Sequence, residues 1–83
     1  MVEVVLFSRP DCCLCHEALE VLQRVRARRG FALRECDVDE SEETRRLYGE
    51  EIPVVLVDGR KAFKYRVDPV KLERLLDRAQ ARG

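Results

Sequence analysis

The sequence predicts an α/β domain in which helices cover both faces of a mixed four-stranded sheet. Three observations support this class: short runs of apolar and β-branched residues, apolar residues at helical spacing between and after these runs, and an Asp-Gly turn signal in the second half. The predicted order of elements is β-α-β-α-β-β-α. A chain of 83 residues has the size of one domain, so residues 1–83 are expected to form a single unit.

The first half of the chain predicts a strand, a helix and a second strand. Residues 2–7 are apolar and β-branched, which is typical of a buried strand. Apolar residues recur at helical spacing from Leu14 to Val25, and Gly30 is a natural end for this helix. Residues 31–38 predict the second strand. A helix between two strands implies that the strands are parallel and joined by a right-handed crossover.

A short third segment predicts a helix that ends at Gly49. Either Asp39 or Ser41 can cap its first turn, because both side chains accept hydrogen bonds from free backbone N–H groups. Asp39 and Glu42 also have the spacing of a capping box. The sequence therefore predicts a capped helix of about two turns here.

The last segment predicts a hairpin and a final helix. Residues 54–57 form an apolar run, and the Asp-Gly pair after them predicts a tight turn into a returning strand over residues 60–66. Asp68 is placed to cap the final helix, and Pro69 suits its first position because that residue needs no N–H donor.

The charges and the hydropathy pattern exclude several classes of protein. The 16 basic and 16 acidic side chains give a net charge of zero, whereas nucleic-acid binders and polybasic membrane anchors need excess positive charge. No apolar run approaches the ~20 residues of a membrane-spanning helix. Glu3 stands where an export signal would carry basic residues. We expect a cytoplasmic monomer that binds neither nucleic acid nor membrane.

The four cysteines do not form the pattern of a disulfide scaffold. Cys12, Cys13 and Cys15 are crowded together, whereas Cys36 stands alone and is expected in the core. Crowded cysteines close only small loops, and such loops remove little entropy from the unfolded chain. In a reducing compartment, clustered cysteines indicate metal binding or redox chemistry instead.

The Cys-x-x-Cys pair lies where the first predicted strand leads into the first helix. The first turn of a helix has free N–H groups and a partial positive charge, which stabilise a thiolate at Cys12. Cys15 follows one turn later on the same face, so the two thiols can cycle between dithiol and disulfide. Cys13 points to another face. Arg9 precedes the pair and can add positive potential there.

Two segments resemble a known family. Residues 7–15, Phe-Ser-Arg-Pro-Asp-Cys-x-x-Cys, resemble the active-site segment of glutaredoxins. Residues 52–55, Ile-Pro-Val-Val, resemble the segment around the substrate-binding proline of that family. The order of elements is similar to the minimal thioredoxin fold along its whole length. Within that superfamily, the chain is most similar to short bacterial glutaredoxin-like proteins.

The resemblance implies roles for individual residues. Cys12 would attack a disulfide, and Cys15 would resolve the mixed disulfide that forms. Pro53 would follow a cis peptide bond and lie beside the cysteines, and the backbone of Ile52 would pair with an extended thiol substrate. Arg9 is included with Ile52 and Pro53 among the predicted substrate-binding residues.

The chain departs from the family after its predicted hairpin. Glutaredoxins carry there a Gly-Gly pair and acidic residues that hold glutathione, and residues 60–68 contain no Gly-Gly. This departure argues against bound glutathione, so no cofactor is expected. The expected partners are a disulfide-containing protein or a low-molecular-weight thiol, with a reductase or glutathione as electron donor.

The sequence therefore predicts a thiol–disulfide oxidoreductase without a metal, and two alternatives remain open. The first is a metal-binding or metal-delivery module that holds zinc or an iron–sulfur cluster. Cys12, Cys13, Cys15 and His16 are candidate ligands, but side chains from one helical turn diverge, so a metal would need a second segment or a second subunit. The second alternative is a partner-binding module with a vestigial site.

Overall fold

The computed structural model describes residues 2–82, and it contains the predicted sequence of helices and strands. One short 3₁₀ helix, η1, was not predicted. None of the helices within these residues is long and apolar enough to cross a membrane. The elements are, in order, β1 (Glu3–Ser8), α1 (Cys13–Arg29), β2 (Ala32–Asp37), η1 (Val38–Glu40), α2 (Glu42–Tyr48), β3 (Val54–Val57), β4 (Arg60–Lys64) and α3 (Pro69–Arg82).

The four strands form one mixed sheet in the order β2-β1-β3-β4. The β1–β2 pair is parallel, whereas β1–β3 and β3–β4 are antiparallel, which confirms the predicted mixed sheet. Phe7 near the end of β1 pairs with Val54 at the start of β3. This register places the end of β1, which continues into the loop before the cysteines, next to the start of β3, which follows Pro53.

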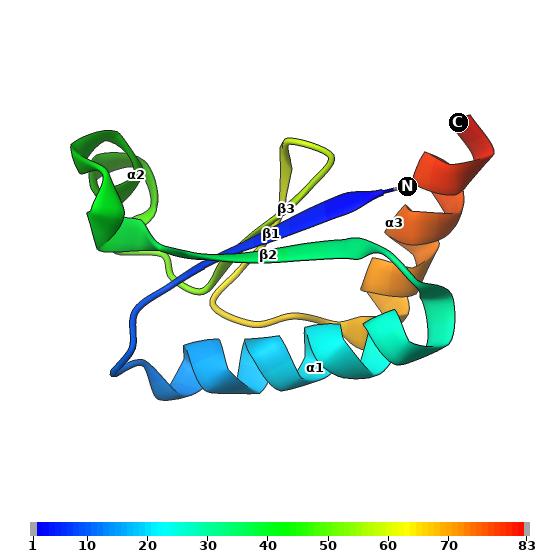
Figure 1. The fold of residues 1–83 in the computed structure, drawn as a ribbon, viewed down its shortest axis with the longest axis horizontal. Coiled ribbons are helices and arrows are strands. Elements are labelled where there is room, and N and C mark those ends of the chain that lie inside the picture. The colour runs from blue at the N-terminus through cyan, green and yellow to red at the C-terminus, as the bar shows by residue number, and fades with distance from the viewer. Residues whose placement is uncertain (1, 83) are drawn as a thin grey trace.

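The helices form two layers around the sheet (Figure 1). One face of the sheet packs against α1 and α3, and α2 lies over one end of the other face. There the ring of Tyr48 stacks on Phe7 of β1, with centroids 5.0 Å apart. Fully buried side chains from the sheet and both long helices fill the core, among them Val4, Leu6, Leu22, Val55, Leu72 and Leu76.

The helix caps agree with the sequence, and at α2 the structure selects one of the two predicted caps. The Oγ of Ser41 accepts hydrogen bonds from the N–H groups of Glu43 and Thr44, which confirms Ser41 as the cap. The predicted alternative cap and capping box at Asp39 are wrong, since Asp39 lies inside η1 and its carboxylate binds Arg9. The carboxylate of Asp39 therefore binds Arg9, which is distant in sequence, in place of the backbone N–H groups of α2.

The hairpin turn and the last cap follow the sequence closely. Asp58 and Gly59 have φ angles of 49° and 83°, the left-handed geometry that a two-residue hairpin turn requires. The carboxylate of Asp68 accepts hydrogen bonds from the backbone of Val70 and Lys71, and Pro69 is the first residue of α3. These signals are local, so the sequence alone predicts them.

Two expectations are wrong in detail. The returning strand ends at Lys64 and not at residue 66, because Tyr65 has a φ of 69°, which strand backbone does not adopt. Cys36 is half-buried and not part of the core, since its strand β2 lies at the edge of the sheet. This partial burial raises the pKa of the Cys36 thiol.

Candidate active site

Cys12 occupies the N-cap of α1, the position that the sequence predicts. Its Sγ accepts a hydrogen bond from the backbone N–H of Cys15 at 3.2 Å, and its own N–H donates to the carbonyl oxygen of Arg9 at 3.2 Å. The side chain is half-buried and thus accessible from solvent. A sulfur held at the start of a 17-residue helix lies at the positive end of the helix dipole, beside the free N–H groups of the first turn.

Cys15 lies behind Cys12 on the inner face of α1. Only 2% of its surface is exposed, and Ala18 and Leu22 are buried along the same helix. Burial, and next the hydrogen bond to the side chain of Cys12, raise the pKa of the Cys15 thiol to about 12. Cys15 therefore keeps its proton at neutral pH, while Cys12 is the thiol that solvent can reach.

The other two candidate ligands at this end of α1 point elsewhere. Cys13 is exposed, and the Nε2 of His16 lies 3.2 Å from the carbonyl oxygen of Pro10. Within residues 2–82, no three Cys, His, Asp or Glu side chains converge on a common point where a metal ion could bind. The described geometry therefore does not favour the metal alternative.

Pro53 follows a cis peptide bond with Ile52, as the resemblance implies. Pro53 is buried and Ile52 is half-buried. The carbonyl oxygen of Pro53 accepts a hydrogen bond from the N–H of Tyr65 at 2.8 Å. Since Val54 pairs with Phe7, this proline lies at the same end of the sheet as the loop that leads to Cys12.

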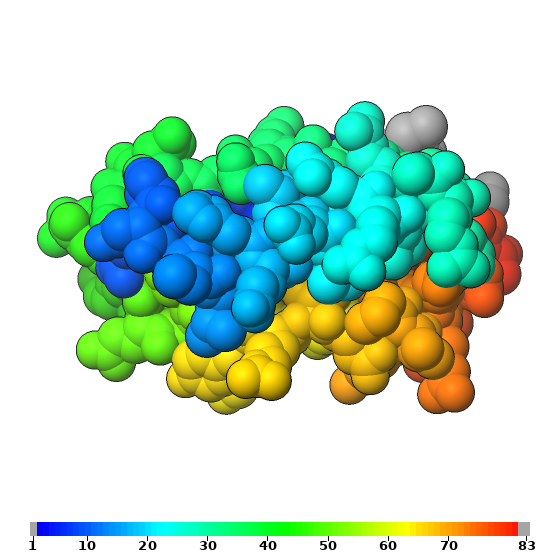
Figure 2. All heavy atoms as spheres, turned by 90° about the horizontal axis from the view of Figure 1, so that it is seen from below, coloured from blue at the N-terminus to red at the C-terminus, as the bar shows by residue number. Residues whose placement is uncertain are grey.

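A small surface cavity lies between the first turns of α1 and the segment after β4. Figure 2 shows these two segments side by side on one face. Leu14, between the two cysteines, is 37% exposed there, although its helical spacing predicted a buried position, and Tyr65 is 46% exposed. The cavity has a volume of about 120 Å³ and is lined by Leu14, Glu17, Ala18, Val21, Tyr65, Arg66 and Val67.

The lining of this cavity includes one residue next to the cysteines and one residue that is bonded to Pro53. Leu14 belongs to the Cys-x-x-Cys turn, and Tyr65 is hydrogen-bonded to Pro53. The cavity therefore offers partly apolar surface next to the Cys-x-x-Cys turn. From the sequence, Tyr65 and Arg66 could line a groove near Pro53 or take ordinary core or surface positions. The left-handed backbone of Tyr65 and its hydrogen bond to Pro53 place it at the cavity.

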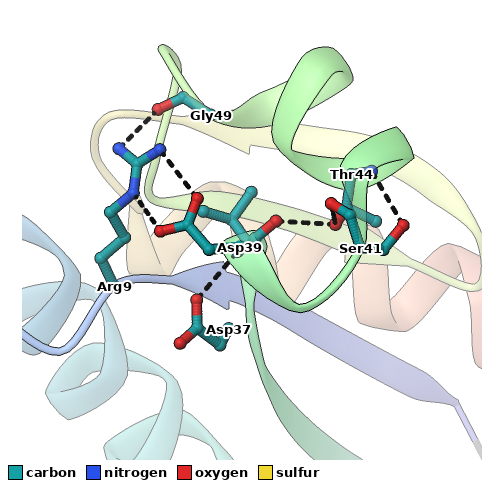
Figure 3. Close-up of polar contacts among 7 residues, drawn as sticks. Arg9, Asp37, Asp39, Ser41, Thr44 and Gly49 are labelled. Carbon is teal, nitrogen blue, oxygen red and sulfur yellow. Dashed lines mark hydrogen bonds and ion pairs between the residues drawn. The ribbon is translucent and has the colours of Figure 1, made fainter.

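Arg9 forms a clamp between the loop before Cys12 and the region around α2 (Figure 3). Its Nε and Nη2 donate to the two carboxylate oxygens of Asp39 at 2.9 and 3.2 Å, and its Nη1 donates to the carbonyl oxygen of Gly49 at 3.0 Å. These hydrogen bonds lower the pKa of the Asp39 carboxyl group. We call these three residues the Arg9 clamp. The contact of Arg9 with substrate stays a prediction.

Gly49 fits the Arg9 clamp because it has no side chain. A Cβ at this position would overlap the carbonyl oxygen of Arg45 and would lie 3.2 Å from the Nη2 of Arg9. Any larger residue would therefore push against the backbone of α2 or against the guanidinium. The sequence predicted Gly49 only as a helix end, since the guanidinium that approaches it comes from residue 9.

The Asp39→Asn variant is expected to lose the pH-dependent part of the stability of the Arg9 clamp. Since Arg9 lowers the folded-state pKa of Asp39, the pair stabilises the fold above the ordinary carboxyl pKa of 3.8. The contribution disappears as the pH falls through the lowered value. Urea midpoints of wild type and variant should differ at pH 7 and converge on acidification. Glu40→Gln, at an exposed neighbour, should show no such convergence; a constant difference for Asp39→Asn would contradict the mechanism.

Comparisons with known proteins agree with this fold. Residues 3–77 match the family described as "Glutaredoxin-like domain (DUF836)". A Mycobacterium tuberculosis protein named "Uncharacterized protein Rv0508" is 33% identical over 75 residues, which cover 84% of this chain and 77% of the relative. The "Glutaredoxin-like protein YDR286C homolog" of Dictyostelium discoideum is 27% identical over 77 residues, covering 86% and 71%.

Solved structures extend the same comparison to the fold. The X. campestris protein XcR50 has a TM-score of 0.73 and 31% identity, covering 89% of this chain and 95% of its own. The Nitrosomonas europaea protein Ne2328 has a TM-score of 0.79 at 24% identity, covering 89% of both chains. A thioredoxin mutant from Halobacterium salinarum has a TM-score of 0.66 at 23% identity, covering 89% and 70%. The chain therefore belongs to the glutaredoxin-like domain family, with a thioredoxin-like fold.

Proposed function

We propose that the protein is a thiol–disulfide oxidoreductase in which Cys12 attacks and Cys15 resolves. The observation that carries the proposal is the division of the two thiols: Cys12 is accessible at the start of α1, and Cys15 is 2% exposed behind it. A nucleophile needs access and a stabilised thiolate, whereas a resolving thiol must stay protonated until the mixed disulfide forms. The family and the fold support redox chemistry of this kind.

The reaction transfers two electrons from the protein to its substrate, together with one proton from Cys15 and one from solvent, because Cys12 attacks as a thiolate. The thiolate of Cys12 attacks one sulfur of a disulfide, a new S–S bond forms, and the other sulfur leaves as a thiolate that takes up a proton. Cys15 then gives its proton to the second leaving sulfur and attacks the Sγ of Cys12. The substrate leaves as two thiols, and the protein holds a Cys12–Cys15 disulfide. An external thiol or dithiol then reduces that disulfide.

The surroundings of Cys12 support a substrate that presents an extended, partly apolar segment. The apolar surface at Leu14 and Tyr65 can hold a side chain, and we assign backbone pairing with the substrate to Ile52 beside the cis Pro53. We therefore propose a disulfide-containing protein or low-molecular-weight disulfide as substrate. The proposal includes a monomer in the cytoplasm, where the reducing environment favours this direction.

The proposal requires no resident cofactor, and electrons would come from a reductase or from glutathione as a diffusing thiol. The segment after the hairpin argues against glutathione bound in the manner of glutaredoxins. Residues 60–68 contain no Gly-Gly pair, and Arg60, Lys61 and Lys64 bring positive charge to β4.

Turnover with a simple dithiol donor tests the proposal. With dithiothreitol as donor, wild-type protein is expected to accelerate the reduction of insulin disulfides. Cys12→Ser should lower this rate at least about a hundredfold, because the nucleophile is lost. Cys13→Ser is the matched control, since Cys13 is the neighbouring exposed thiol, and it should retain most of the rate. Full activity of Cys12→Ser would overturn the assignment, and stoichiometric metal that is lost in that variant would favour the metal alternative.

A further inference from the structure

A second, larger surface cavity lies between the β3–β4 hairpin and one side of α3. It has a volume of about 560 Å³, within the range of small-molecule sites. The hairpin turn and the end of α3 lie far from the start of α1 in Figure 1, so this cavity is separate from the cysteines. We call it the hairpin cavity. It is lined by Val57, Asp58, Arg60, Lys61, Ala62, Lys71, Leu75, Arg78 and Ala79.

The lining of the hairpin cavity combines an apolar floor with a charged rim. Val57 and Ala62 come from the sheet, and Leu75 and Ala79 come from one side of α3. All four belong to the hydrophobic core or pack against it. Such a floor favours a ligand that carries an apolar group, because its burial releases water from both surfaces.

The rim contains four cations and one carboxylate, and two of these five groups already have partners. Lys61 forms an ion pair with Glu51. The carboxylate of Asp58 accepts a hydrogen bond from the N–H of Glu3 at 2.9 Å. Among the residues that the structure describes, no carboxylate lies within ion-pair distance of the remaining three rim cations. These are Arg60, Lys71 and Arg78.

The acidic residues of α3 do not neutralise this rim, because they pair with another helix. Glu73 and Asp77 form ion pairs with Arg28 and Arg29 at the end of α1. Thus α3 presents its acids to α1 and two of its bases, Lys71 and Arg78, to the hairpin cavity. A chain with zero net charge thereby acquires a local positive site.

We propose that the hairpin cavity binds a small organic phosphate with an apolar body. Three cations around one cavity match the two negative charges and three oxygens of a phosphate monoester better than a single carboxylate. Two of the three are arginines, which can bind phosphate through two parallel hydrogen bonds. The apolar floor accepts the organic part. This site is separate from the proposed redox reaction and does not depend on it.

Titration with phenyl phosphate, followed by backbone amide NMR, tests the proposal. Saturable shifts are expected at the hairpin turn and along α3 from Lys71 to Ala79, and not around Cys12. Inorganic phosphate lacks the apolar body, and benzoate lacks the second charge, so each should bind at least about tenfold more weakly.

Variants that remove positive charges from α3, inside or outside the lining of the hairpin cavity, provide the matched comparison. The double variant Lys71→Gln/Arg78→Gln should weaken phenyl phosphate binding at least about tenfold. Arg74→Gln removes an exposed charge from the same helix but not from the cavity lining, so its affinity should stay close to wild type. Equal affinity for inorganic phosphate or benzoate, shifts centred on the cysteines, or unchanged binding by the double variant would overturn the proposal. Retained amide spectra show whether each variant is folded.

Discussion

Iodoacetamide at pH 7 is expected to modify Cys12 and to leave Cys15 almost untouched. The reagent attacks thiolates, and a thiol with a pKa of about 12 is ionised in only about one molecule in 10⁵ at this pH. Cys15 is also 2% exposed, which further restricts access. Cys12 is accessible and lies at the positive end of α1. We therefore expect rates that differ by several orders of magnitude.

The measurement is peptide mass spectrometry over a time course of alkylation in reduced protein. Cys13→Ser provides the background, because it removes the exposed thiol between the two cysteines. Raising the pH above 7 should increase the ionised fraction of Cys15 and accelerate its modification. Equal rates for both cysteines at pH 7 would contradict the division of roles.

The Cys15→Ser variant is expected to stop at the mixed disulfide. After reaction with 2-hydroxyethyl disulfide, Cys12 would carry one mercaptoethanol group, and no second thiol would be in place to displace it. Intact mass should show one adduct per chain, and peptide mapping should place it on Cys12. Wild-type protein should instead release both thiols and form the Cys12–Cys15 disulfide, with a loss of two hydrogens.

The matched control for this experiment is Cys15→Ser combined with Cys36→Ser. Cys36 is half-buried on β2 and plays no part in the proposed reaction, so its removal should not change the trapped yield. An adduct on Cys13 or Cys36 would assign the attacking role to that residue, and free turnover in Cys15→Ser would assign the resolving role elsewhere.

Short-range chemistry explains which parts of the fold and the site could be predicted from the sequence. The N-cap position of Cys12, the Asp-Gly turn before β4 and the cap at Asp68 each depend on a few adjacent residues. Their backbone geometry follows from local hydrogen bonds and steric limits. The resemblance to glutaredoxins added the cis bond before Pro53, which no local pattern in this chain reveals.

Contacts between distant segments explain the errors. Asp39 is a good helix cap by its residue type, but Arg9, 30 positions earlier, binds its carboxylate in the folded chain. Leu14 follows the helical spacing of the core, yet in the folded chain it lies at the surface, where it lines the small cavity with Tyr65 and is 37% exposed. In the first case a distant ion-pair partner outweighs the capping preference of the residue, and in the second case the surface position outweighs its helical spacing.

The sequence by itself determined the class of fold, the position of the Cys-x-x-Cys pair at the start of a helix and the net charge of zero. Only the tertiary structure decided how these features act. Burial behind Cys12 raises the pKa of Cys15. The ion pairs between α1 and α3 occupy Glu73 and Asp77, so that Lys71 and Arg78 at the hairpin cavity have no acidic partner among the described residues. Burial and charge pairing depend on distances in space, which the order of residues along the chain does not contain.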